Sequence, residues 1–276
     1  MKNILLPTDF SQNSFYAMDY AMKYFKGEEI NFVVLNIQKS SEYIMDDLMT
    51  ASPGTSVHEA ISGDNKEKLN NLVNSYRETY ANEAFNFEAI FDFDVFIDAI
   101  AQTVVSKKID LIIMGTNGAS GAKEAIFGSN TLQVIRNIKC PVLAIPENFH
   151  FQSLEEVMFT VINEKYPAKD TLKPLLQLFN LHDHHLHVLH ITPAALTDKG
   201  KAKEEASCLF PDTPIRNHFI EGIPVPMAIS TFTQLMEVDL HCIQIEQQSF
   251  LDRFIHGSDT SKISYGTKVP LLVIHN

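Results

Sequence analysis

The feature that most constrains this chain is a short apolar segment followed by glycines at a fixed spacing. Residues 111–114 are four consecutive apolar residues, a length that suits a strand buried on both faces. Gly115 and Gly118 follow at once, where the chain must turn tightly and where a ligand can approach the backbone. Nine residues later, Gly128 and Ser129 begin the next predicted element.

That next element has the pattern of a helix. Leu132, Ile135 and Ile138 recur every three residues, and Ser129 can serve as the N-cap. A glycine loop between a strand end and a helix N-terminus exposes unpaired N–H groups at the positive end of the helix dipole. The segment therefore predicts a phosphate-binding site.

The glycine spacing differs from those of two common phosphate-binding loops. No Lys precedes Ser129, so the segment is not G-x-x-x-x-G-K-[ST], and it is not G-x-G-x-x-G either. The order Gly, two residues, Gly, nine residues, Gly-Ser resembles the nucleotide-binding loop of the universal stress protein (UspA) family at every position. The resemblance implies an α/β fold of the Rossmann-like, adenine nucleotide alpha hydrolase-like kind, with ATP as the ligand.

A second segment carries the same resemblance. Residues 2–6 form a short strand, and Pro7, Thr8 and Asp9 follow it. In the family, an Asp at this position hydrogen-bonds the adenine and ribose side of ATP, which implies that role for Asp9. Asp also commonly caps a following helix or turn, so a structural role is the alternative. Ile37 matches the family's apolar residue beside the adenine, and a core strand residue is its alternative.

The resemblance thus implies one nucleotide site built from both segments. Ser129 would offer its hydroxyl and N–H to phosphate, and Mg²⁺ is expected to accompany the phosphates. The sequence shows no aligned general base and no metal-holding carboxylate pair, so we assign no catalytic residue and expect slow ATP hydrolysis at most. The implied cofactor-binding residues are Pro7, Thr8, Asp9, Ile37, Met114, Gly115, Gly118, Gly128, Ser129 and Asn130.

The second half of the chain repeats the first. When the sequence is shifted so that Ala99 lies on Ala228, the two halves align without a gap from this position onward. The repeat predicts two tandem five-stranded parallel-sheet α/β domains, at residues 1–147 and 152–276. In single-domain relatives the last strands pair between chains, so we expect their counterparts here to pair within the chain, as an intrachain pseudo-dimer. Coinciding residues include Asp110/Asp239, Leu111/Leu240, Gly128/Gly257, Ser129/Ser258 and Pro141/Pro270.

The second copy lacks most of the nucleotide loop. Gly115 falls on Gln244 and Gly118 on Gln247, while the Gly-Ser dipeptide survives. Gln side chains would fill the space of a triphosphate, and a non-glycine residue is strained at positive φ. The segment corresponding to residues 7–9 is Thr-Val-Ile-Asn, without an acidic residue. We therefore expect nucleotide in the N-terminal domain only.

The remaining elements follow from hydrophobic periodicity. Residues 39–65 are a polar, acidic insertion, for which we expect a loop with a short helix near residues 43–48. A helix is expected over residues 66–84, and a short strand over residues 218–220.

Composition limits the partners and the location. The chain has 22 basic and 34 acidic residues, a net charge of −12, which disfavours nucleic acid and anionic membranes. It contains no apolar run of membrane-spanning length, and too few apolar residues precede Pro7 for a signal peptide, so we expect a cytoplasmic protein. The widely spaced Cys140, Cys208 and Cys242 suit buried, reduced thiols.

Histidines cluster in one segment. His182, His184, His185, His187 and His190 suggest a metal site, because imidazole is a common metal ligand. However, residues 186–191 form a predicted strand, whose alternate side chains point to opposite faces and do not converge. A structural role is therefore favoured, and we assign no metal site.

These observations favour an ATP-binding stress-response sensor or regulator, with a further homodimer left open. The alternatives are an interaction scaffold whose loop stays empty and a slow ATP-consuming enzyme.

Overall fold

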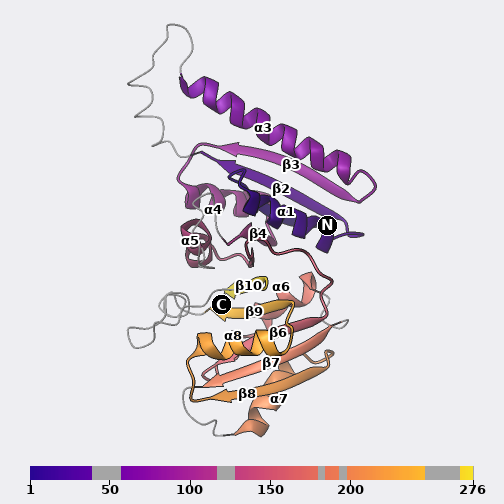
Figure 1. The fold of residues 1–276 in the computed structure, drawn as a ribbon, viewed down its shortest axis with the longest axis vertical. Helices are drawn as coiled ribbons and strands as arrows, with labels where there is room; N and C mark the ends of the chain where they lie inside the picture. The colour runs from indigo at the N-terminus through magenta and orange to yellow at the C-terminus, as the bar shows by residue number, and fades with distance from the viewer. Residues whose placement is uncertain (39–56, 117–127, 180–183, 193–197, 246–267, 276) are drawn as a thin grey trace.

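The computed structural model describes residues 1–38, 57–116, 128–179, 184–192, 198–245 and 268–275 (Figure 1). The predicted short helix near residues 43–48 lies outside them. In the first half the elements are β1 (Lys2–Pro7), α1 (Gln12–Tyr24), β2 (Ile30–Ile37), α3 (Val57–Thr79), β3 (Phe85–Asp92), α4 (Phe96–Lys107), β4 (Leu111–Gly115), α5 (Ser129–Asn137) and β5 (Val142–Ile145). In the second half they are β6 (Glu156–Ile162), α6 (Lys169–Leu178), β7 (His185–Thr192), α7 (Lys199–Leu209), β8 (Ile215–Glu221), α8 (Val225–Leu235), β9 (Leu240–Ile245) and β10 (Leu271–His275).

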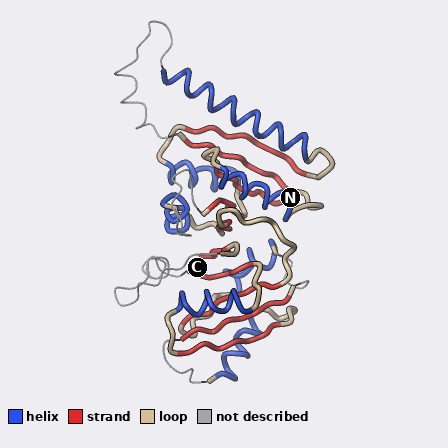
Figure 2. Tube along the Cα trace, in the orientation of Figure 1, coloured by secondary structure: helices blue, strands red, loops and turns tan. Residues whose placement is uncertain are grey.

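All ten of these strands belong to one sheet, in the order β3-β2-β1-β4-β5-β10-β9-β6-β7-β8. Each half contributes five parallel strands, and Figure 2 shows them following one another along the long axis of the molecule. The halves join where β5 and β10 pair antiparallel, with Leu272 opposite Leu143. The predicted α/β class with two tandem five-stranded units is therefore confirmed, and so is the pairing of the two last strands within the chain.

Strand register supports the internal repeat. Ile4 pairs with Leu111 in the first half, and Val157 pairs with Leu240 in the second. Because Leu111 and Leu240 are counterparts in the repeat, β1 corresponds to β6, with Ile4 matching Val157. Backbone conformation follows the same correspondence: Phe10 has a φ of 59° and its counterpart Asn163 a φ of 53°.

Two helical layers cover the sheet. Buried side chains of α1, α3, α6 and α7 form a core on one face, and those of α4, α5 and α8 form the core on the other. The first core runs across the β5–β10 junction, where Tyr24 of α1 lies 5.2 Å from Phe179, measured between ring centroids. Aromatic residues after β5 reinforce this junction, since the ring of Phe151 lies 5.3 Å from that of Tyr20.

Several predicted details were wrong. α3 begins at Val57, not at residue 66, and it ends at Thr79. β8 runs over seven residues, beyond the predicted 218–220, because it pairs with β7 along its whole length.

Cys140 and Cys242 are buried as expected, whereas Cys208 is exposed on α7. Across the described residues, no helix is both long and apolar enough to cross a membrane.

Candidate nucleotide site

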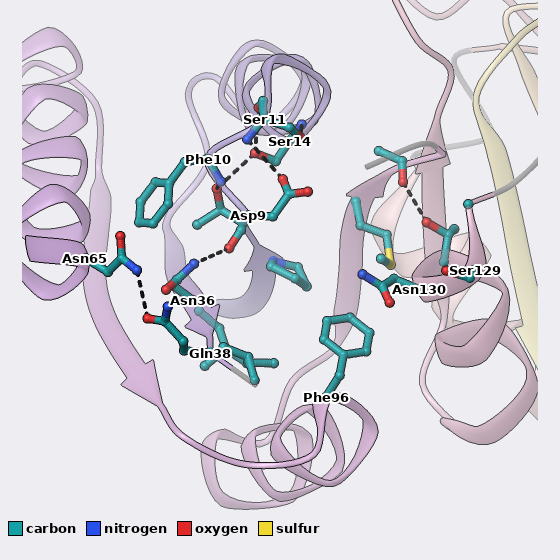
Figure 3. A pocket seen from close by; sticks show the side chains of 18 of the residues that line it. Asp9, Phe10, Ser11, Ser14, Asn36, Gln38, Asn65, Phe96, Ser129 and Asn130 are labelled. Carbon is teal, nitrogen blue, oxygen red and sulfur yellow. Dashed lines mark hydrogen bonds between the residues drawn. The ribbon is translucent and has the colours of Figure 1, made fainter. Parts of the chain in front are cut away.

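A cavity of about 650 Å³ opens at the carboxyl ends of β1, β2 and β4. This edge of a parallel sheet is where α/β proteins place ligands. Side chains from the β1–α1 turn, the end of β2, α3, α4 and the start of α5 surround it (Figure 3). Gly118 lies outside the described residues. The other nine predicted site residues all line this cavity: Pro7, Thr8, Asp9, Ile37, Met114, Gly115, Gly128, Ser129 and Asn130.

The β1–α1 turn is held by side-chain hydrogen bonds. The Oγ1 atom of buried Thr8 accepts from the Phe10 N–H at 3.1 Å and lies 2.9 Å from the Ser14 hydroxyl. The Asn36 amide donates to the Thr8 carbonyl at 2.7 Å and so ties the turn to β2. These contacts fix the backbone at the floor of the cavity and leave the Asp9 side chain exposed at its rim.

Asp9 stabilises the turn before α1, which is the structural role expected as the alternative to ligand binding. Its Oδ1 atom accepts a hydrogen bond from the Ser11 N–H at 3.0 Å, which closes a turn before α1. Ser11 is the N-cap of α1 and accepts from the Ser14 N–H at 3.3 Å. Since a carboxylate has two oxygens and four acceptor positions, this turn leaves Asp9 able to bind a ligand as well.

The β4–α5 connection presents a helix N-terminus to the cavity. Gly128, not Ser129, is the N-cap of α5, so the predicted capping role of Ser129 was wrong. The first helical bond runs from the Leu132 N–H to the Gly128 carbonyl at 3.0 Å. The N–H groups of the three residues before Leu132 therefore have no carbonyl partner within the helix. Thr131 anchors the start of α5, because its hydroxyl donates to the Gly115 carbonyl at 2.7 Å.

Gly115 is required for a different reason from the one expected. Among the described glycines only Gly27 and Gly222 have a positive φ, so backbone strain does not explain Gly115. A Cβ atom there would lie 2.8 Å from the Asn13 carbonyl oxygen. The residue is therefore glycine because α1 packs directly onto the end of β4.

The cavity also has residues that sequence reasoning missed. Lys68 of α3 is exposed and lines the wall, and Phe96 lines it from the first turn of α4. Gln38 and Asn65 form a hydrogen-bonded pair at 2.7 Å. A helical pattern continued back from residue 66 would have put Asn65 and Lys68 one turn apart on a single face.

The second half differs at the corresponding positions. Ile191, the counterpart of half-buried Ile37, is fully buried. Gln244 replaces Gly115, and its buried Nε2 atom has no hydrogen-bond partner among the described residues. The counterpart of Pro7 is buried Thr160, whose hydroxyl lies 2.9 Å from Nε2 of His241. Burial lowers the pKa of His241 to about 3, so this imidazole is neutral.

Histidines of β7 form hydrogen bonds near the amino ends of β6 and β7. Glu156 Oε1 lies 2.7 Å from His185 Nδ1, and its other oxygen contacts buried His187. His187 Nδ1 lies 2.9 Å from His218 Nε2. Burial tends to raise the pKa of Glu156, but the two histidines outweigh it and lower that pKa overall.

His190 points to the opposite face from this group and bonds Asn217 at 2.8 Å, as strand alternation predicts. Within the described part of the chain, no group of three or more His, Cys, Asp or Glu side chains is arranged so that it could hold a metal ion. His182 lies outside that part.

Comparison with known proteins places the chain in a family. The family model described as the universal stress protein family matches residues 1–146. This is more than half of the chain, so the protein belongs to the universal stress protein family, and the predicted family resemblance is confirmed.

The chain is also similar to individual proteins. A universal stress protein of Methanocaldococcus jannaschii is 27% identical over 154 residues, which cover 52% of this chain and 94% of that relative. The crystal structure of a universal stress protein from Archaeoglobus fulgidus aligns with a TM-score of 0.69 at 19% identity, over 99% of this chain and 96% of that one. A universal stress protein solved in complex with cAMP aligns at 17% identity and a TM-score of 0.38, over 52% of this chain and 96% of that one.

Proposed function

We propose that this protein binds ATP in the cavity of its first half, and only there, and acts as a nucleotide-dependent regulator in a stress response. The observation that carries the proposal is the convergence of nine residues, named from the sequence and its family resemblance, on one cavity at the carboxyl edge of the sheet. Its volume of about 650 Å³ is within the usual range for small-molecule sites.

The phosphates would lie at the start of α5. The N–H groups there point outward from the helix and combine with the positive end of its dipole. Ser129 and Asn130 add side-chain donors at the same point, and Lys68 adds a positive charge to the cavity from its α3 wall. These groups offset the net charge of −12, which by itself repels an anionic ligand.

The adenine and ribose would occupy the rest of the cavity. Ile37 and Met114 offer apolar surface for the base, and Asp9 offers a carboxylate to the ribose or adenine. Asp9 is the only carboxylate among the described lining residues, so any Mg²⁺ would be held mainly by the phosphates and water.

The restriction to the first half rests on the differences between the two copies. Gln244 places a side chain where the first half has Gly115, and Ile191 is buried where Ile37 borders the cavity. We accordingly propose a nucleotide-binding domain at residues 1–147 and a degenerate domain at residues 152–276. A cytoplasmic location belongs to the same proposal.

The test introduces a negative charge at the proposed phosphate site. Aspartate in the first turn stabilises a helix but repels phosphate, so Ser129→Asp should fold normally and bind ATP at least tenfold more weakly. Ser258→Asp makes the same change at the corresponding position of the second half and should bind ATP like the wild type. Calorimetric titration of nucleotide-free protein with ATP, with and without Mg²⁺, measures both.

The same titration separates the alternatives. No ATP binding by the wild type would leave the scaffold as the better account, and equal losses in the two variants would contradict a first-half site. Titration with cAMP shows whether this nucleotide occupies the site instead. Phosphate release that stops in Asp9→Ala would establish the slow ATPase.

A further inference from the structure

We propose that the side-chain amides of Gln38 and Asn65 form a paired recognition group for the polar edge of adenine. The inference rests on the proposed function and adds to it the residues that select the base. Neither residue belongs to the glycine loop or to the β1–α1 turn. They come from the end of β2 and from α3, and they meet at the wall of the cavity.

Both amides are held on rigid elements. The Gln38 N–H donates to the Asp92 carbonyl at 3.0 Å, which continues the pairing of β2 with β3. Asn65 precedes the part of α3 that is anchored in the core by Leu69, 1% exposed, and Val73, fully buried. A site built on fixed elements loses little conformational entropy when a ligand binds.

Their mutual hydrogen bond defines what they offer to a ligand. The Asn65 Nδ2 atom donates to Gln38 Oε1 at 2.7 Å. The Gln38 Nε2 donor and the Asn65 Oδ1 acceptor are then the groups left for a ligand, and no hydrogen bond within the described residues uses either. Their mutual bond therefore fixes which amide atom each residue has left for a ligand: a donor from Gln38 and an acceptor from Asn65.

Adenine is complementary to this arrangement. Its N1 atom accepts a hydrogen bond, and its adjacent N6 amino group donates one. With N1 toward the Gln38 amide and N6 toward the Asn65 oxygen, each group of the base meets a complementary atom. Guanine would place its O6 acceptor against the Asn65 oxygen and its N1–H against the Gln38 amide, so both contacts would be repulsive.

The position of the pair agrees with the orientation proposed for the nucleotide. In Figure 3, Gln38 and Asn65 lie across the cavity from Ser129 and Asn130, at the start of α5. Phosphates bound at α5 direct the base of the same molecule toward the opposite side. Phe96 also lines the cavity and offers an aromatic surface for the base.

The test separates recognition of the base from recognition of phosphate. Dissociation constants for ATP, GTP and inorganic tripolyphosphate are measured by calorimetry for the wild type and for the double variant Gln38→Met, Asn65→Leu. Met and Leu keep approximately the side-chain size and remove the hydrogen-bonding groups. Asn70→Leu, an equivalent change at an exposed position of α3 that does not line the cavity, is the control.

We expect the double variant to bind ATP at least tenfold more weakly and tripolyphosphate within twofold of the wild type. Its preference for ATP over GTP should fall toward one. The single variant Gln38→Met leaves α3 unchanged and should show the same trend, which keeps the test valid if the double variant is unstable.

ATP affinity within twofold of the wild type in both variants would overturn the inference and leave the nucleotide site standing. Equal losses for ATP and tripolyphosphate, or tighter wild-type binding of GTP than of ATP, would also overturn it. Absence of ATP binding in the wild type would overturn both proposals together.

Discussion

A Cβ atom on Gly115 would lie 2.8 Å from the carbonyl oxygen of Asn13 and 2.9 Å from its Cγ atom. These distances are shorter than van der Waals contact, so even alanine at this position must displace α1 from the end of β4. We expect Gly115→Ala to lower the free energy of unfolding by about 1–3 kcal/mol, the usual cost of overpacking. Urea denaturation measures it.

The matched control is Gly200→Ala in α7. There the nearest heavy atom to an added Cβ is the end of the Asp198 side chain, at 3.1 Å, which can move slightly. Alanine also favours the helix, so stability should change by less than about 1 kcal/mol. Equal losses for the two variants would contradict the packing role of Gly115.

Lys68 should make ATP binding sensitive to salt. It is exposed, and it and Asp9 are the only charged residues among those described as lining the cavity. Lys68→Gln should weaken ATP binding about threefold to tenfold at low ionic strength and less at high salt, because exposed charges are screened. Lys66→Gln on the same helix should have little effect, and equal effects of both variants would show that only the overall charge matters.

His241 should make the folded state less stable in acid. Burial lowers its pKa to about 3 from the ordinary value of 6.5. Between pH 6.5 and pH 3, the unfolded chain therefore binds a proton at this residue and the folded chain does not. Stability from the neutral imidazole is complete above pH 6.5 and falls as the pH drops below it. This single group should remove about 2 kcal/mol between pH 7 and pH 5.

The variant that checks this is His241→Ile with Thr160→Val, which removes both hydrogen-bonding partners. Isoleucine already occupies the corresponding position of the first half, Ile112. The slope of unfolding free energy against pH should decrease in the double variant. An unchanged slope would mean that other histidines dominate the acid sensitivity.

The strand junction should couple the two halves. Leu143 of β5 and Leu272 of β10 are directly opposite and fully buried. Leu272→Ala should lower the free energy of unfolding by about 2–5 kcal/mol, as other truncations of buried leucines do. Leu235→Ala, at a position 75% exposed, should cost less than about 0.5 kcal/mol.

Thermal unfolding tests the coupling itself. Because one core crosses the junction, the wild type should unfold in a single transition. Two separate transitions in the wild type would contradict a shared core, and a loss in Leu272→Ala as small as that in Leu235→Ala would contradict tight packing at the junction.

The fold was largely predictable because the signals were local and repeated. The apolar segment at β4 and the glycines after it define a strand and a turn, and the constant shift between the halves supplies an independent second copy. Pairing of β5 with β10 followed from the repeat together with the resemblance to single-domain relatives, whose last strands pair between chains. The start of α3 was missed because Ser62, Gly63 and Asp64 are residue types typical of a loop, although the helix continues through them.

The site was predictable only where its residues match the family resemblance. Nine such residues meet at the cavity, whereas Gln38, Asn65, Lys68 and Phe96 match no known motif and are brought together by tertiary packing. The need for glycine at position 115 was predicted, but its cause was not, because the contact with Asn13 joins segments that are far apart in the sequence.

The most direct test of the central claim is the stoichiometry of ATP binding. Nucleotide-free wild-type protein is titrated with MgATP by calorimetry, and the number of sites per chain is read from the equivalence point. We predict one site per chain, in the first half. Two sites per chain would contradict the degeneracy of the second half, and no binding would contradict a nucleotide-dependent function.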